Sequence, residues 1–215
     1  MDIKMAVNKL NALLPLKARV EKLPSNLKVL HKQVLYSLVN QGSPPTRDEL
    51  NDALGEECVE NSLEKLGSDD LIVLDAEGRL AVGAYPVTIE KTPHKILVNG
   101  HSIYAMCALD AVSVAPMFEV DTIIQSRCHV SQTMITIRMH GSDILEALPT
   151  VDVTVGIRWK MPSAVAAHSM CMEMVFLKDR KTAMAWQNGD TQNISLFSLS
   201  EAVAFGKAFF RPLLS

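Results

Sequence analysis

Residues 95–114 read KILVNGHSIYAMCALDAVSV, and the pattern of the chain changes around them. Lys95 to Val98 is rich in residues that favour a β-strand, and Asn99-Gly100 is a strong turn signal. Ser102 to about Val114 is apolar and compatible with a helix, which would end near Pro116. A strand, a tight turn and a helix in this order predict a mixed α+β unit.

Strand-like stretches recur on both sides of this segment. They are predicted at Val87–Glu90, Thr122–Cys128, Met134–Met139, Val151–Trp159, Cys171–Leu177 and Ile194–Phe197. Pro162 to Ala167 is compatible with a helical turn, and Ser200 to Phe210 predicts an amphipathic closing helix. We interpret residues 86–215 as one α+β domain with a mainly antiparallel sheet.

The first 85 residues contain helix signals followed by a hairpin signal. Apolar residues recur at helical spacing within residues 1–23, and Pro15 and Pro24 break this helical stretch. A clearer helix runs from Ser25, its N-cap, to Gln41, and Gly42 stops it. A capping box at Thr46–Glu49 opens a helix through Leu54, and a third helix covers Glu56–Leu66. Leu71–Leu74 and Arg79–Val82 then form a hairpin signal. This order predicts a winged-helix-like helical bundle as the N-terminal domain, residues 1–85.

Composition and charge exclude several classes of protein. The chain has 215 residues, 48% of them hydrophobic, which is enough for one sizeable domain or a small and a medium one. A net charge of −3 argues against bulk binding of nucleic acid or of an acidic membrane surface. No apolar run reaches the roughly 18 residues of a spanning helix, and Met1–Lys4 lacks the apolar region of a signal peptide. We expect a cytoplasmic protein.

The winged-helix pattern admits a DNA-binding regulator as one hypothesis. Its recognition helix would be Glu56–Leu66, which contains four glutamates and one lysine. Such a helix would be repelled by phosphates where basic side chains normally provide the affinity. We therefore favour a scaffold that packs against the rest of the chain and has no nucleic-acid partner.

Cys107 and Asp110 are the first candidates for chemistry. If the segment around them is helical, residues three apart share a face and the carboxyl group lies beside the thiol. The flanking Tyr104, Met106 and Leu109 are fairly apolar, so burial should raise the pKa of the carboxyl group and let it carry a proton near neutral pH. The alternative is a buried structural cysteine next to a surface aspartate.

The other cysteines are open to plainer interpretations. Cys171, between two methionines in a strand-like run, could be a small apolar residue on an inward face. His168 and Cys171 could form half of a zinc site, with Cys128 and His129 as the other half. Neighbours on a strand point to opposite faces, so Cys128 and His129 cannot readily bind one ion together. We interpret Cys128 as structural and Cys58 as incidental. The sequence contains no CxxC, HExxH, P-loop, GxGxxG or GxSxG motif.

Three motifs in the second half resemble those of the alkylmercury (organomercurial) lyases. They are YAMCALD at residues 104–110, SRC at 126–128 and SMC at 169–171, in the family's order and at similar spacing. The closing helix, SEAVAFG at 200–206, and the winged-helix-like front also resemble that family, so the likeness covers essentially the whole chain. It implies that residues 86–215 are the catalytic domain.

The resemblance also implies roles for single residues. The family's two mercury-binding cysteines fall on Cys107 and Cys171, its proton-handling carboxylate on Asp110, and its structural cysteine on Cys128. Tyr104, Met106 and Met170 are then expected at the pocket for the organic group. Better-known members often have an aromatic residue before each catalytic cysteine, where this chain has Met106 and Met170, and a second cysteine where it has Met172. The chemistry should survive these changes, whereas the shape of the pocket should differ.

The expected activity is protonolytic cleavage of a carbon–mercury bond. Soft mercury selects thiolates, and a nearby carboxylic acid can give the leaving carbon its proton, so the products are a hydrocarbon and thiol-bound mercuric ion. We expect no organic cofactor. The expected partners are the organomercurial, cellular thiols and, as the resemblance implies, a mercuric reductase that accepts the ion. The main alternative is a cysteine-based metal sensor or chaperone, which would need the thiols but no proton donor.

Overall fold

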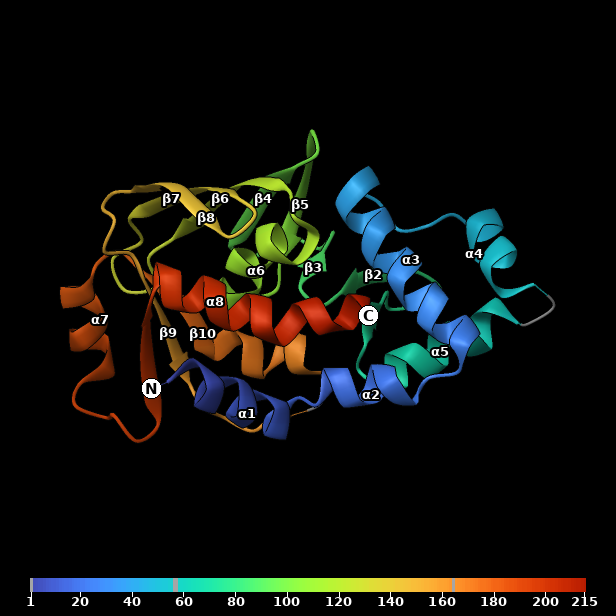
Figure 1. Cartoon of the computed structure of the whole chain (residues 1–215), viewed down its shortest axis with the longest axis horizontal. Helices are drawn as coiled ribbons and strands as arrows, with labels where there is room; N and C mark the ends of the chain where they lie inside the picture. Colours follow the sequence, from blue (N-terminus) through green and yellow to red (C-terminus); the bar gives the residue numbers. More distant parts are fainter. Residues whose placement is uncertain (1, 56–57, 164) are drawn as a thin grey trace.

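A computed structural model describes residues 2–55, 58–163 and 165–215 (Figure 1). Its helices are α1 (Ile3–Leu13), α2 (Leu16–Lys22), α3 (Ser25–Gln41), α4 (Arg47–Leu54), α5 (Val59–Ser68), α6 (Ala108–Phe118), α7 (Arg180–Gln187) and α8 (Leu199–Phe210), with short 3-10 helices η1 (Ala166–His168), η2 (Met170–Glu173) and η3 (Arg211–Leu214). Its strands are β1 (Ile72–Leu74), β2 (Ala81–Ala84), β3 (Val87–Thr88), β4 (His94–Val98), β5 (His101–Ala105), β6 (Asp121–Arg127), β7 (Met134–His140), β8 (Asp143–Leu148), β9 (Thr154–Arg158), β10 (Met174–Leu177) and β11 (Ile194–Ser198).

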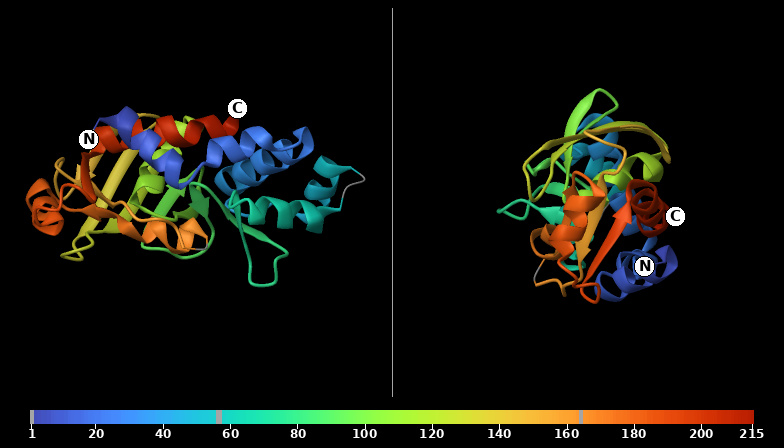
Figure 2. Two further views of the ribbon diagram at one scale, coloured as in Figure 1. Left: turned by 90° about the horizontal axis from the view of Figure 1, so that it is seen from below. Right: turned by 90° about the vertical axis from the view of Figure 1, so that its left-hand side faces the viewer.

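Two antiparallel sheets carry the strands of the described residues. The larger has the order β1-β2-β3-β5-β4-β6-β7-β8, and the smaller has the order β10-β9-β11. Helices α3, α4 and α5 lie at one end of the elongated molecule, and α1 runs beside α8 (Figures 1 and 2). The α+β class with a mainly antiparallel sheet is therefore confirmed. No helix within the described residues is long and apolar enough to cross a membrane.

Helix α6 is the centre of the fold. Every residue from Ala108 to Met117 is buried, because the helix packs on α8 and on strands β4, β5, β6 and β10. Several of these residues are small, which lets α8 approach closely. An added Cβ on Gly206 of α8 would stand only 1.9 Å from the Ser113 Oγ of α6. A helix buried on all sides holds whatever it carries in a fixed position.

The predicted helix from Ser102 to Val114 is wrong in its first part. The structure has strand β5 there, and α6 begins only at Ala108. The reason is the Asn99-Gly100 turn: both residues have positive φ, 49° and 80°, and they join β4 to β5 as a two-residue hairpin with Val98 opposite His101. A turn of this kind requires a strand on each side.

The predicted strand from Cys171 to Leu177 is also shorter than expected. Cys171 belongs to the 3-10 helix η2, and β10 begins at Met174. Other expectations are confirmed: the Thr46–Glu49 capping box opens α4, Gly42 ends α3 with φ 71°, and β6 pairs with β7. Helix α3 is preceded by Pro24 at the N-cap position, so Ser25 is its first residue and not its cap. Part of the third predicted helix, residues 56 and 57, lies outside the described residues.

The predicted hairpin near residue 80 exists, and it is continuous with the large sheet. Strands β1 and β2 are antiparallel, with Val73 opposite Gly83. Strand β2 then pairs with β3, where Gly83 lies opposite Thr88, and β3 pairs with β5. Hydrogen bonding thus runs across residue 85. The division into residues 1–85 and 86–215 stays a prediction about folding units.

Candidate active site

The start of α6 places a thiol and a carboxyl group side by side. Cys107 is the N-cap of this helix, with extended backbone, and its Sγ accepts a hydrogen bond from the Asp110 backbone N–H at 3.4 Å. Cap geometry therefore folds the Cys107 side chain over the first turn, which contains Asp110. The N-terminal end of a helix favours negative charge, and it suits a thiolate formed there.

The second thiol arrives from the other end of the chain. Cys171, in η2, has its Sγ 3.9 Å from Oδ2 of Asp110. The two sulfurs and one carboxylate oxygen of Cys107, Asp110 and Cys171 lie within 4.8 Å of one another, and all three residues are buried. In the described part of the chain this is the one His, Cys, Asp or Glu group close enough to hold a metal ion. The structure thus brings together the three residues selected from the sequence.

Burial controls the protonation of this cluster. It raises the pKa of Asp110 from 3.8 to about 7, against the opposing effect of hydrogen bonds with Cys107 and Cys171. Burial also raises the pKa of the Cys107 thiol well above its usual value, with Cys171 and Asp110 adding to the effect. For Cys171 the hydrogen bond with Cys107 acts in the lowering direction, yet burial and the Asp110 carboxyl group leave its pKa raised. The thiols are therefore protonated at rest, beside a carboxyl group able to gain or lose a proton at neutral pH.

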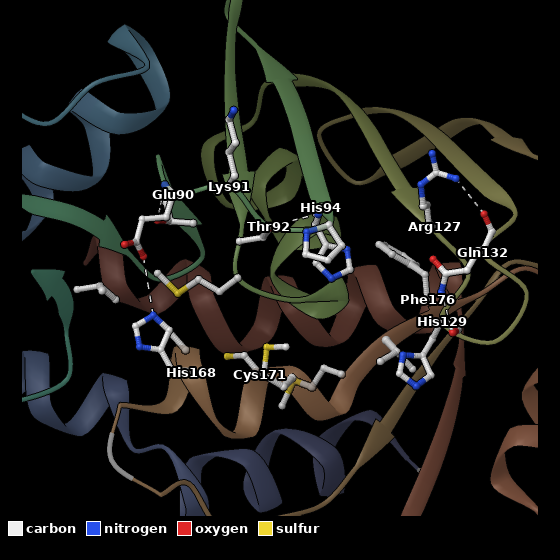
Figure 3. A pocket seen from close by; sticks show the side chains of 18 residues that line it. Glu90, Lys91, Thr92, His94, Arg127, His129, Gln132, His168, Cys171 and Phe176 are labelled. Atoms are coloured by element: carbon white, nitrogen blue, oxygen red, sulfur yellow. Dashed lines mark hydrogen bonds and ion pairs between the residues drawn. The ribbon is translucent and has the colours of Figure 1, made fainter. Parts of the chain in front are cut away.

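A cavity of about 630 Å³ leads to the cluster (Figure 3). Cys171 forms part of its wall, whereas Cys107 and Asp110 do not. The cavity is lined by apolar side chains, among them Met106, Met172, Met174, Val175 and Phe176, and by polar ones, which include Glu90, Lys91, Thr92, His94, Arg127, His129, Gln132 and His168. Cys171 is therefore the cluster residue that an entering molecule meets first.

The structure places one of the three predicted pocket residues at the cavity. Met106 lines the cavity, but Tyr104 and Met170 do not. Tyr104 lies in β5, where side chains alternate, and its neighbours Ile103 and Ala105 take the buried face. Met170 is only 1% exposed and packs into the core at the start of η2. The sequence did not single out Met174, whose Sδ is 3.6 Å from Sγ of Cys107. The only signal for it was its place in a methionine-rich run, which is more often core filler.

The remaining cysteines lie apart from the cluster. Cys128 is fully buried at the end of β6, where its N–H donates to the Thr133 carbonyl and its own carbonyl accepts from Gln132. Burial acts to raise the pKa of the Cys128 thiol, but hydrogen bonds from Ser131 and nearby backbone N–H groups outweigh it and lower that pKa. Cys58 is exposed. Neither belongs to the metal-competent group of the described residues.

Comparison with known proteins identifies the family. A model of the alkylmercury lyase family matches residues 87–211, more than half of the chain and the whole of the cluster. The chain belongs to the alkylmercury lyase family. It is therefore an enzyme that acts on organomercurials, and the cluster of two cysteines and an aspartate fits a catalytic site for cleaving the carbon–mercury bond.

Individual members of the family match this chain over most of their length. The chain is 25% identical over 175 residues to an alkylmercury lyase of Staphylococcus epidermidis, which covers 80% of this chain and 78% of that protein. It is 25% identical over 193 residues to an alkylmercury lyase of Pseudomonas putida, covering 89% and 87%. A solved structure described as the mercury-bound form of MerB2 has the same fold, with a TM-score of 0.75, 21% identity, and coverage of 93% of this chain and 98% of that one.

Proposed function

We propose that the chain cleaves carbon–mercury bonds by protonolysis, with Cys107 and Cys171 as the mercury-binding thiolates and Asp110 as the proton shuttle. The observation that carries this assignment is the buried cluster itself, in which two sulfurs and one carboxylate oxygen lie within 4.8 Å of one another. Mercury(II) is soft and selects thiolates over oxygen and nitrogen ligands. The products are a hydrocarbon and a mercuric ion held by both sulfurs.

The geometry suggests an order of events. Cys171 lines the cavity, so it takes the organomercurial first, by exchange with the thiol that carried it; that thiol leaves with one proton. Cys107 then adds as the second thiolate and gives its proton to the Asp110 carboxylate, which lies within 4.8 Å of its sulfur. Two thiolates weaken the mercury–carbon bond, and Asp110 delivers its proton to the departing carbon. One proton from each thiol is thus used, and no organic cofactor is needed.

Asp110 is suited to both halves of this transfer. A shuttle must accept a proton from a thiol and then release it to carbon, which requires a pKa near the working pH. The pKa of about 7 that burial gives Asp110 meets this requirement. A metal chaperone has no use for such a group next to its thiols, so the buried carboxyl group favours the enzyme over the sensor or chaperone.

The proposal also covers the two domains, the role of Cys128 and the cellular partners. We propose that residues 1–85 form a winged-helix-like structural domain that does not bind DNA, and that residues 86–215 form the catalytic domain. Cys128 serves the fold and not the reaction, which its full burial and backbone hydrogen bonds support. The enzyme works in the cytoplasm, receives its substrate from cellular thiols and passes mercuric ion to thiols or to a mercuric reductase.

Hydrocarbon release tests the proposal directly. Purified protein is incubated with methylmercury and excess thiol, and methane is measured by gas chromatography. Asp110→Asn keeps the shape of the side chain but cannot shuttle a proton. We expect it to bind methylmercury through both cysteines, as seen by mass spectrometry, yet to release methane at least about a hundredfold more slowly. Normal methane release by this variant would remove Asp110 from the mechanism, and mercury binding without methane from the unaltered protein would favour the chaperone.

A further inference from the structure

Met174 places a third sulfur beside the two thiols. It is the first residue of β10, and its side chain is 3% exposed. Its Sδ lies 3.6 Å from the Sγ of Cys107, and the residue also lines the cavity. Cys171 precedes it by three residues, so a single segment brings one thiol and one thioether to the same point on α6.

The contact has a chemical direction. In the resting protein the Cys107 thiol donates a weak hydrogen bond to the Met174 thioether. When Cys107 binds mercury, it loses that proton, and the lone pairs of the thioether then face a sulfur that carries a soft metal. Thioethers are soft ligands of the kind that soft metals select. Mercury held by two thiolates can accept a further weak donor without giving up either of them.

The neighbouring methionines do not share this position. Met172 also lines the cavity, but its side chain is 64% exposed. Met106 is buried, and its Cε lies near Gly83 of β2, where an added Cβ would be 2.9 Å away. Met174 alone among these three has its sulfur in contact with a thiol of the cluster in the described structure. Met172 therefore offers a matched control on the same segment.

We propose that the Met174 thioether is a third soft donor to the mercury of the substrate and of the product. This inference rests on the proposed mercury binding by Cys107 and Cys171. The thioether is in contact with the metal in both the bound organomercurial and the bound mercuric ion, so it helps to hold both. Its removal should raise KM for the organomercurial and speed loss of the product, while kcat for hydrocarbon release should fall far less than it does when a thiolate is removed.

Mercuric chloride alone is the probe for the first test. One equivalent is bound to the unaltered protein, to Met174→Leu and to Met172→Leu, and is then titrated with glutathione as a competitor. Two glutathiones take up each mercuric ion, so a tenfold weaker binding, about 1.4 kcal/mol, moves the competition midpoint about threefold. We expect Met174→Leu to lose mercury at about a threefold lower glutathione concentration. Met172→Leu should match the unaltered protein. Equal retention by all three proteins would overturn the proposal.

A spectroscopic test identifies the neighbours of the bound metal directly. In protein labelled with selenomethionine, X-ray absorption at the mercury edge should show one selenium neighbour beside two sulfurs, and the same protein with Met174→Leu should show none. Absence of selenium from the unaltered site would also overturn the proposal. These tests use metal binding and not turnover, so a protein that shows the selenium neighbour but releases no methane would contradict only the proposed reaction.

Discussion

At the scale of single residues, the burial of Asp110 has a consequence for stability. Its folded-state pKa of about 7 lies above the ordinary value of 3.8, so the folded protein holds this proton more tightly than the unfolded chain does. Below about pH 4 the group is protonated in both states and contributes nothing. Between about pH 4 and 7 only the unfolded state loses the proton, so stability falls as pH rises, and above pH 7 the full cost is present.

Asp110→Asn should therefore stabilise the protein at high pH. The gain in unfolding free energy should be close to zero at pH 4 and grow to a few kcal/mol at pH 8, because each unit of pKa shift corresponds to about 1.4 kcal/mol. Urea unfolding at pH 4, 5, 6, 7 and 8 measures it for both proteins. Parallel pH profiles would show that this carboxyl group titrates normally in the folded state. A variant that gains stability while it loses turnover would show that the acid is kept for its chemistry.

The two thiols should fail in different ways. Cys171 lines the cavity and Cys107 does not, so Cys107→Ala should still form a stoichiometric adduct with methylmercury, whereas Cys171→Ala should form it slowly. Neither variant should release methane at a measurable rate, because one thiolate cannot weaken the mercury–carbon bond as two can. Mass spectrometry of the adduct at short times and gas chromatography of methane distinguish the steps. Near-normal turnover by either variant would refute the two-thiol mechanism.

At the scale of secondary-structure elements, the close approach of α8 to α6 holds Cys107 and Asp110 in place. A methyl group on Gly206 would meet the Ser113 Oγ at 1.9 Å and its Cβ at 3.0 Å. Gly206→Ala should therefore destabilise the protein by about 1–3 kcal/mol, as overpacking does, although alanine is the better helix former. Adding Ser113→Ala should recover part of the loss, which thermal unfolding can measure. Equal melting temperatures for Gly206→Ala and the unaltered protein would mean that α8 shifts freely on α6.

The elements that the sequence predicts well are those with local signals. Thr46 and Gly42 mark helix ends through their own backbone chemistry, and the structure has both where expected. Residues 102–107 are apolar enough to be compatible with a helix, but the Asn99-Gly100 turn requires a second strand and determines the structure there. Helix α7, capped by Asp179, was not predicted, because its polar sequence buries only Ala183.

The site was predictable in part for the same reason. Cys107 and Asp110 are neighbours through a local motif, whereas the approach of Cys171 depends on packing between segments about sixty residues apart, which only the family resemblance supplied. Even with that resemblance, the predicted strand at Cys171 is wrong, because the residue lies in the 3-10 helix η2. The contact between Met174 and Cys107 spans 67 residues and leaves no mark in the sequence.

At the scale of the whole molecule, a partly buried polar network ties the N-terminal region to the segment that carries Cys171. The Tyr85 hydroxyl donates to Oδ1 of Asp70 at 2.9 Å and accepts from the Ala167 N–H at 3.0 Å. Oδ2 of Asp70 faces the Arg19 guanidinium and the Ala166 N–H, each at 3.4 Å. Burial raises the pKa of Tyr85, so its hydroxyl stays protonated and able to donate. Asp70, just after α5, and Tyr85, in the β2–β3 connection, thus hold η1, while Arg19 of α2 pairs with Asp70. Only Ser169 separates η1 from η2.

Tyr85→Phe should loosen this attachment without touching a cysteine. It leaves the buried Ala167 N–H without its acceptor and removes one hydrogen bond to Asp70, which costs about 1–3 kcal/mol of stability. Because η1 leads into Cys171, iodoacetamide should label Cys171 several-fold faster in this variant, while Cys107, held as the cap of α6, should react as before. Tyr36→Phe is the control, since Tyr36 is 44% exposed and its ring contacts Phe118, at the opposite end of α6 from Cys107. Peptide mass spectrometry measures labelling at each cysteine, and methane release measures turnover.

A uniform increase at Cys107, Cys128 and Cys171 would indicate general destabilisation, and unchanged labelling would show that other contacts place Cys171. A selective increase at Cys171 with slower turnover would make the N-terminal region part of what positions the second thiol.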